Sequence, residues 1–190
     1  MLAVQLAILG VASAAPTKAN EPASVARAFY WAYLKTPASG LLVGESRSAL
    51  SPFLTPRLLR VLDDAKACQD AWTRQQPQGN TDKPPFVDCC LFSSVPDGMP
   101  TSSSVGKSES LPDGRSMVIV NFMRKDPPGT YADPAIPLGT IRWRDTLLLQ
   151  RMEGRYFVDD VLFIDDRPPR TEQLLSESFR SCKDGRFVAP

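Results

Sequence analysis

The stretch TIRWRDTLLLQRMEGRYFVDDVLFIDD, residues 140–166, decides the fold because it has the pattern of two strands joined by a tight turn. Thr140 to Gln150 alternates between apolar and polar side chains, as a strand with one buried face does. Glu153-Gly154 is a turn signal, and Arg155 to Ile164 is rich in β-branched and aromatic residues. The stretch therefore predicts an antiparallel hairpin, with inward candidates at Ile141, Trp143, Leu147 and Leu149.

More strands are predicted upstream of this hairpin. Ser116 to Met123 reads SMVIVNFM and is a β run, and Phe86 to Phe92 is short and apolar. Turn signals stand at Asp97-Gly98 and Asp113-Gly114. The Ser-rich run between these turns, residues 101–110, is interpreted as a mobile hairpin loop. The sequence thus predicts a sheet of four to five antiparallel strands.

Helices are predicted on both sides of the strands. Ser24 can cap a helix over VARAFYWAYLK, and Thr55-Pro56 begins a second one that should run through Trp72. After Pro168-Pro169 ends the last strand, Thr171 can cap a tail helix. The fold class is therefore α+β, with helices packed on a curved antiparallel sheet and a C-terminal helix added.

The N-terminus predicts an export signal. Residues 1–15 are uncharged and mostly apolar, end near Ala12-Ser13-Ala14, and are too short an apolar run to span a bilayer. The alternative is a buried N-terminal helix, and the basic start usual for a signal peptide is missing. We expect a leader over 16–23, the folded domain over 24–166 and a tail over 167–190, in a periplasmic or secreted bacterial protein.

Composition excludes several kinds of partner. The chain has 22 basic and 21 acidic residues, mixed along its length, so no basic stripe marks it as a nucleic-acid binder. No apolar run after the signal is long enough for stable membrane insertion.

The four cysteines fit the oxidising compartment that export implies. An even count in an exported chain suggests disulfides, and four cysteines allow three pairings. Cys89 and Cys90 are neighbours, and neighbouring cysteines seldom bond to each other. We therefore expect Cys68 and Cys182 each to pair with one of these two. No CxxC is present, which disfavours a zinc or redox site.

The chain has no histidine, which removes Ser-His-Asp and Cys-His nucleophile systems and histidine metal ligands. The acid pairs Asp159-Asp160 and Asp165-Asp166 lie about 20 Å apart along a strand, too far for one metal site. We interpret each pair as a strand end. We predict no catalytic residue, cofactor or metal, and keep Asp159 and Asp160 as speculative pocket acids.

Two motifs in the middle of the chain are near matches to known sites. Gly106-Lys107-Ser108 resembles the end of a phosphate loop but lacks its first glycine. Ser104 and Lys107 have the spacing of a penicillin-binding nucleophile pair, which must open a helix. The Pro-rich residues 126–139 are either a partner-binding loop or a long connection.

The order of several short motifs resembles an exported bacterial family called domain of unknown function 3828. That family belongs to the nuclear transport factor 2-like, or cystatin-like, superfamily of α+β cones. The resemblance would cover residues 22–166, and it implies a helix pair curled against a sheet. Ketosteroid isomerases of this superfamily use an Asp base, which is why Asp159 and Asp160 are kept. The motifs that carry it lie at residues 29–34, 64–70, 83–85, 143–149 and 154–161.

Superfamily members include enzymes, binding pockets and dimeric adaptors, so the fold alone does not fix the function. The leading expectation is a non-catalytic binding module of the bacterial envelope, for a protein partner such as a toxin or for a small ligand. One alternative is a small-molecule enzyme with Asp159 or Asp160 as base. Another is a structural envelope protein that forms a homodimer through its sheet.

Overall fold

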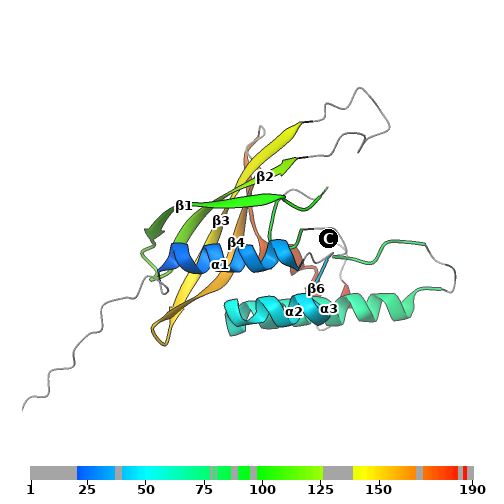
Figure 1. Cartoon of the computed structure of the whole chain (residues 1–190). Coiled ribbons are helices and arrows are strands. Elements are labelled where there is room, and N and C mark those ends of the chain that lie inside the picture. Colours follow the sequence, from blue (N-terminus) through cyan, green and yellow to red (C-terminus); the bar gives the residue numbers. More distant parts are fainter. Residues whose placement is uncertain are drawn as a thin grey trace, which may run out of the picture.

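In a computed structural model of the chain, α-helices pack on one side of a curved five-stranded antiparallel sheet (Figure 1). The expected α+β fold class is confirmed. The expected signal segment, residues 1–15, and residues 126–138 of the Pro-rich stretch lie outside the described residues. The structure describes residues 21–36, 40–77, 79, 81–86, 90–94, 98–125, 139–165, 169–183 and 186–187.

The two predicted N-terminal helices are present, and a short one lies between them. Helix α1 spans Pro22–Lys35, α2 spans Gly44–Leu50 and α3 spans Pro56–Gln75. Helix α1 begins at Pro22, before Ser24, because proline suits the first helical position. Thr55 caps α3, since its Oγ1 accepts a hydrogen bond from the Leu58 amide at 3.1 Å. Helix α2 is not predicted by the sequence.

The sheet is a simple meander. Its strands β1 to β5 are neighbours in chain order, and each pairs with the next in antiparallel fashion. The β3–β4 hairpin is the predicted one, and Glu153 and Gly154 at its turn both have positive φ. The strands are Ser102–Ser110 (β1), Ser116–Lys125 (β2), Thr140–Met152 (β3), Arg155–Asp165 (β4) and Thr171–Leu174 (β5).

Three segments differ from the prediction. Ser102–Ser110 is the edge strand β1 and not a loop, because an exposed edge can be built from small polar residues without an apolar face. That strand also rules out the helix which the Ser104–Lys107 nucleophile motif needs. Phe86 and Cys90 have φ of 63° and 77°, so the expected strand from Phe86 to Phe92 is wrong at its described residues.

The expected C-terminal helix is replaced by a strand and a short 3₁₀ helix. Residues 171–174 pair with β4 as β5, and the 3₁₀ helix η3 spans Leu175–Phe179. A small hairpin follows, made of β6 (Cys182–Lys183) and β7 (Arg186–Phe187). Leu175 and Phe179 are buried, as the prediction for the tail requires.

The core lies between the helices and the inner face of the sheet. Helix α1 crosses the sheet, and α3 runs beside it against β4 (Figure 1). Leu147 and Leu149 are buried there as predicted, whereas Ile141 at the end of β3 is 38% exposed. An aromatic cluster fills the space between α1 and the sheet, formed by Phe29, Tyr30, Tyr33, Phe92 and Phe122.

Candidate functional site

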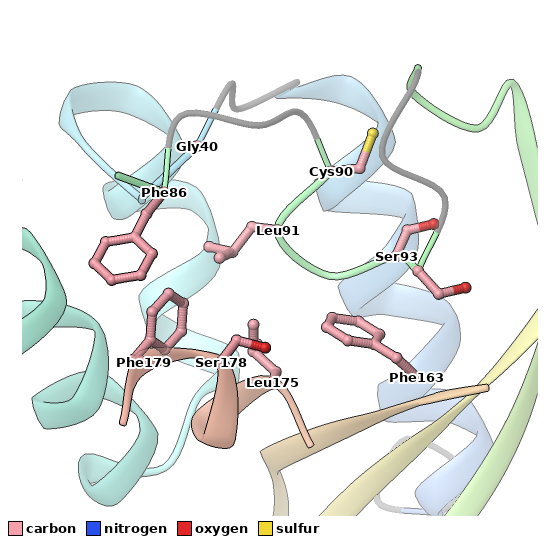
Figure 2. A pocket seen from close by; sticks show the side chains of 10 residues that line it. Gly40, Phe86, Cys90, Leu91, Ser93, Phe163, Leu175, Ser178 and Phe179 are labelled. Carbon is pink, nitrogen blue, oxygen red and sulfur yellow. The ribbon is translucent and has the colours of Figure 1, made fainter. Parts of the chain in front are cut away.

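A cavity of about 220 Å³ lies between Phe86 with residues 90–94 on one side and the 3₁₀ helix η3 on the other. Figure 2 shows Phe86 and Phe179 facing each other on one side of it and Phe163 on the other. The described residues that line it are mostly apolar, and none is charged. They are Gly40, Phe86, Cys90, Leu91, Ser93, Ser94, Phe163, Leu175, Ser178 and Phe179.

The polar residues of this lining are Ser93, Ser94 and Ser178, and the hydroxyls of Ser93 and Ser94 also bond to Trp143 and Asp145. A hydroxyl can donate one hydrogen bond and accept others, so it suits a neutral hydroxyl, carbonyl or amide on a ligand. The apolar remainder favours a ligand that is itself mostly apolar. The chemistry of the lining is therefore that of a small uncharged molecule.

The first wall of the cavity, residues 90–94, is held by two tyrosines of α1. The Tyr30 hydroxyl donates to the Phe92 carbonyl at 3.1 Å, and the Phe92 amide donates to the Tyr33 hydroxyl at 3.4 Å. Burial raises the pKa of both tyrosines, most strongly for Tyr30, so both stay protonated at neutral pH. An irregular segment without a strand partner is thus fixed by side chains.

Asp145 on β3 holds the same wall from the sheet side. Its Oδ2 accepts from the Ser94 amide at 2.9 Å, and its Oδ1 accepts from the Ile164 amide at 3.3 Å. Beside it, Trp143 Nε1 donates to Ser93 Oγ at 3.0 Å. Asp145 therefore fixes both the serine segment and the part of β4 that carries Phe163.

Asp145 is fully buried, and sequence reasoning missed it. Burial raises its pKa above the ordinary value, although the hydrogen bonds from Ser94 and Ile164 act in the opposite direction. Its signal was present in the sequence. Trp143, Leu147 and Leu149 were all predicted to point inward. Asp145 is an even number of positions from each of them, so it belongs to the same face of the strand.

The second wall is η3 with the residues around it. Phe179 contacts Phe86 edge to face, with ring centroids 5.0 Å apart. Ser176 donates twice to Asp160, from its amide to Oδ1 at 3.1 Å and from its hydroxyl to Oδ2 at 2.5 Å. The wall is therefore tied to β4 just before its pocket-lining residue Ser178.

The two speculative pocket acids lie side by side in the middle of β4. The interpretation of Asp159-Asp160 as a strand end is wrong, because β4 continues to Asp165. The register between β3 and β4 shifts here: Leu148 pairs with Asp160 and Leu149 with Val158. Asp159 is the extra residue of a β-bulge, which re-aims the side chains, so strict alternation also fails.

Arg57, in the first turn of α3, binds both acids. Its Nε donates to Asp159 Oδ1 at 2.9 Å and its Nη2 to Asp160 Oδ2 at 3.0 Å, with a further bond from Nη2 to the Asp159 carbonyl. The Thr55 hydroxyl also donates to Asp159, at 3.0 Å. Burial alone would lower the pKa of Arg57, but its bonds to the two acids outweigh this and raise it.

Both carboxylates are thus held by several donors, and Arg115 lies 3.7 Å from Asp159 Oδ2 as a further cation. Neither Asp159 nor Asp160 is among the residues that line the cavity. Asp160 reaches the cavity only through Ser176. A carboxylate held by a guanidinium and several other donors is a poor proton acceptor for a ligand.

The disulfide between Cys68 and Cys182 differs from the expected pairing, and Cys90 is disulfide-bonded as well. Cys68 on α3 and Cys182 on β6 have their sulfur atoms at bonding distance and their Cα atoms 6.0 Å apart. The expectation that each pairs with Cys89 or Cys90 is therefore wrong. The tail turns back onto α3 after η3, which brings together residues that are 114 positions apart in sequence. Cys89 lies outside the described residues.

Two further features concern metal binding and membrane insertion. Within the described part of the chain, no cluster of three or more Cys, Asp or Glu residues could hold a metal ion. In the same residues, no helix has the length and apolar character needed to cross a bilayer.

Comparisons with protein-family models, with curated proteins and with solved structures found no match for this chain.

Proposed function

We propose that this chain is a non-catalytic binding module of the bacterial envelope, and that it holds a small, uncharged, mainly apolar ligand in the cavity. The observation that carries the proposal is the lining: apolar side chains with three serine hydroxyls, and no charged group among the described residues. Such a surface rewards desolvation of apolar groups and offers neutral hydrogen bonds for orientation. It offers a charged ligand no partner.

The acids support binding over catalysis. A general base must reach the proton that it removes. Asp159 and Asp160 face Arg57, and both oxygens of Asp145 accept backbone amides. All three carboxylates therefore position parts of the protein. The described contacts do not favour an enzyme that uses Asp159 or Asp160 as a base. They also do not favour a binding module for a toxin or a structural protein that dimerises through its sheet.

The envelope location rests on two observations. Residues 1–15 have the pattern of an export signal. The Cys68–Cys182 pair fits an oxidising compartment, where disulfides persist. The proposal also retains the resemblance to domain of unknown function 3828, with which the order of helices before an antiparallel sheet is compatible.

The size of the cavity limits the ligand. A cavity of roughly 150 Å³ is enough for benzene. The volume of about 220 Å³ therefore suits a molecule of one or two rings, or a short branched chain. A probe of about twelve non-hydrogen atoms, at roughly 0.4 kcal/mol each, would bind with a Kd on the order of 0.1–1 mM.

The test compares two probes of the same shape and different charge. 2-Naphthalenemethanol is neutral, and 2-naphthoate carries a negative charge at pH 7. Binding to the oxidised mature chain is followed by amide chemical shifts in two-dimensional NMR. We expect the alcohol to shift Leu91 and Ser178, and the carboxylate to bind at least about tenfold more weakly, since a bare charge is costly to desolvate.

A pair of tryptophan variants locates the site. Ser178→Trp fills the cavity and should abolish binding of the alcohol, whereas Ser48→Trp on the exposed face of α2 should leave it unchanged. Far-UV circular dichroism confirms that both variants fold. Equal binding of the two probes, or undiminished binding to Ser178→Trp, would count against the proposal.

A further inference from the structure

The second wall of the cavity is anchored at both ends to other parts of the fold. At its start, Ser176 is hydrogen bonded to Asp160 through both its amide and its hydroxyl. Three residues beyond its end, Cys182 is bonded to Cys68 on α3. The wall residues that line the cavity are Leu175, Ser178 and Phe179. Leu175 lies beside the first anchor, and the other two lie between the anchors. We call residues 175–182 the wall segment.

The wall segment has little structure of its own. The helix η3 has five residues, and such a short 3₁₀ helix is not stable in isolation. Its serines and its glutamate are partly exposed, and only Leu175 and Phe179 are buried. The hairpin that follows has two residues in each strand. The position of Phe179 against Phe86 must therefore depend on the anchors.

The two anchors differ in kind. The Asp160 anchor is non-covalent and is supported by other donors, because Arg57 and the Val161 amide also bind that carboxylate. The disulfide is reversible, since a reductant can cleave it. Cleavage would remove the covalent anchor and leave the wall segment held by Asp160 and by its packing on β4 and α3. Phe179 could then leave Phe86, and that side of the cavity would open to water.

We propose that the Cys68–Cys182 disulfide is a redox switch for the cavity, and that Asp160 is the positioning residue at the opposite end of the wall. The ligand binds while the bond is intact and is released when a dithiol reduces it. This inference rests on the proposed function. In the step, the sulfur–sulfur bond breaks and each sulfur gains one electron and one proton. The dithiol supplies both and becomes a disulfide.

The site of Cys68 makes the switch local. Cys68 is fully buried on α3, next to a helix face that packs on the core through Leu58, Leu62 and Ala65. These contacts do not involve the disulfide, so α3 should keep its place after reduction.

The test uses two readouts, of which only one needs a ligand. Hydrogen exchange of amides in residues 175–182 is measured in the oxidised chain, in the chain with dithiothreitol and in the Cys68→Ala/Cys182→Ala variant. Binding of 2-naphthalenemethanol is measured in the same three samples. Dithiothreitol added to the double variant reports any effect of the remaining cysteines. Val118→Ala, a core change remote from the wall, controls for lowered stability.

We expect loss of the bond to speed exchange in the wall segment by at least about tenfold and to weaken probe binding by about tenfold, with α1 unchanged. The Val118→Ala control should show neither local change. Asp160→Asn, with the disulfide intact, should accelerate hydrogen exchange at the Ser176 amide and weaken binding of 2-naphthalenemethanol. Asp160→Glu should recover part of this affinity.

Two results would overturn the switch. One is unchanged exchange in residues 175–182 after the bond is lost. The other is equally faster exchange in α1, which would show that the bond holds the whole fold and not the wall. If the oxidised chain binds neither naphthalene probe, the proposed function fails, and the exchange data still decide whether the disulfide controls the wall.

Discussion

Removal of the Arg57 side chain tests whether the acid pair is structural. In Arg57→Ala, Asp159 and Asp160 lose two charge-assisted hydrogen bonds, and the Asp159 carbonyl loses a third. Such bonds contribute about 1.5–3 kcal/mol each when buried. The Arg57 side chain is 42% exposed, so water replaces part of them, while the two carboxylates stay nearly buried. We expect the free energy of unfolding to fall by about 2–3 kcal/mol.

The assay is urea unfolding of the oxidised mature chain, with a double-mutant cycle. In the background Asp159→Asn/Asp160→Asn, the same Arg57→Ala change should cost only about 1 kcal/mol, because its charged partners are gone and the bond to the backbone carbonyl of residue 159 remains. Arg47→Ala is the matched control. Arg47 bonds to Asp63 at 2.8 Å, but Asp63 is 60% exposed, so this change should cost no more than about 1 kcal/mol.

Two outcomes would refute the reasoning. Arg57→Ala could cost the same with and without the two acids, and its contribution would then come from helix α3 alone. Alternatively, Arg57→Ala could leave stability unchanged while probe binding or an enzymatic rate falls. That result would assign the acids to ligand chemistry and remove the main argument for a non-catalytic module.

Three further predictions concern other anchors. The stability of the wild type relative to Asp145→Asn should rise as the pH falls from 7 towards 4.5. Burial raises the pKa of Asp145, so the folded protein binds the proton of this carboxyl more tightly than the unfolded chain does. Urea unfolding of both proteins across this pH range would show a flat or opposite trend if the carboxylate were not buried as described. Thr55→Ala removes both the cap of α3 and a bond to the acid pair and should cost about 2–3 kcal/mol by thermal unfolding, whereas Thr55→Ser should cost less than about 1 kcal/mol. Peptide mapping without reduction should find Cys68 linked to Cys182, and a link from either to Cys89 or Cys90 would contradict the tail geometry.

The parts of the fold that could be predicted are those with strong local patterns. The hairpin of β3 and β4 combines alternation with a Glu-Gly turn, and α3 combines a Thr-Pro start with an apolar stripe. The sequence pattern of each of these elements can be recognised within ten to twenty residues. Helix α2 has seven residues, just under two full turns, which is too short to show an apolar stripe.

The failures have particular causes. Strand β1 is an exposed edge, so its residues carry no apolar alternation. The tail residues 171–179 have a helical spacing of apolar groups, but residues 171–174 pair with β4 and form a strand. The bulge at Asp159 cannot be read from one sequence, because an extra residue in a strand leaves the composition unchanged.

The disulfide failure has a different origin. Pairing was argued from the rarity of bonds between adjacent cysteines, which says nothing about where the tail goes. Cys182 was expected on one helical face with Leu175 and Phe179, directed at the body of the protein. In the structure it reaches α3 through a turn after η3, and its partner is set by this route of the chain. Sequence spacing could not supply that information.

The three buried acids share one physical role, which is to hold parts of the fold in place. Strands hold their neighbours by backbone ladders, but the two walls of the cavity are irregular and have no ladder. Asp145 supplies acceptors for Ser94 on one wall, and Asp160 supplies them for Ser176 on the other. Asp159 fixes the start of α3 through Thr55.

A buried carboxylate is costly unless it is fully partnered, so such an anchor forms only in one arrangement of the chain. The shape of the cavity is therefore specified by its polar supports, whereas its lining stays apolar and neutral. This division of roles separates the module from an Asp-based enzyme, in which the acid must face the ligand. It follows that Asp160→Asn should change the mobility of the wall more than the chemistry at its surface, which hydrogen exchange and probe specificity measure separately.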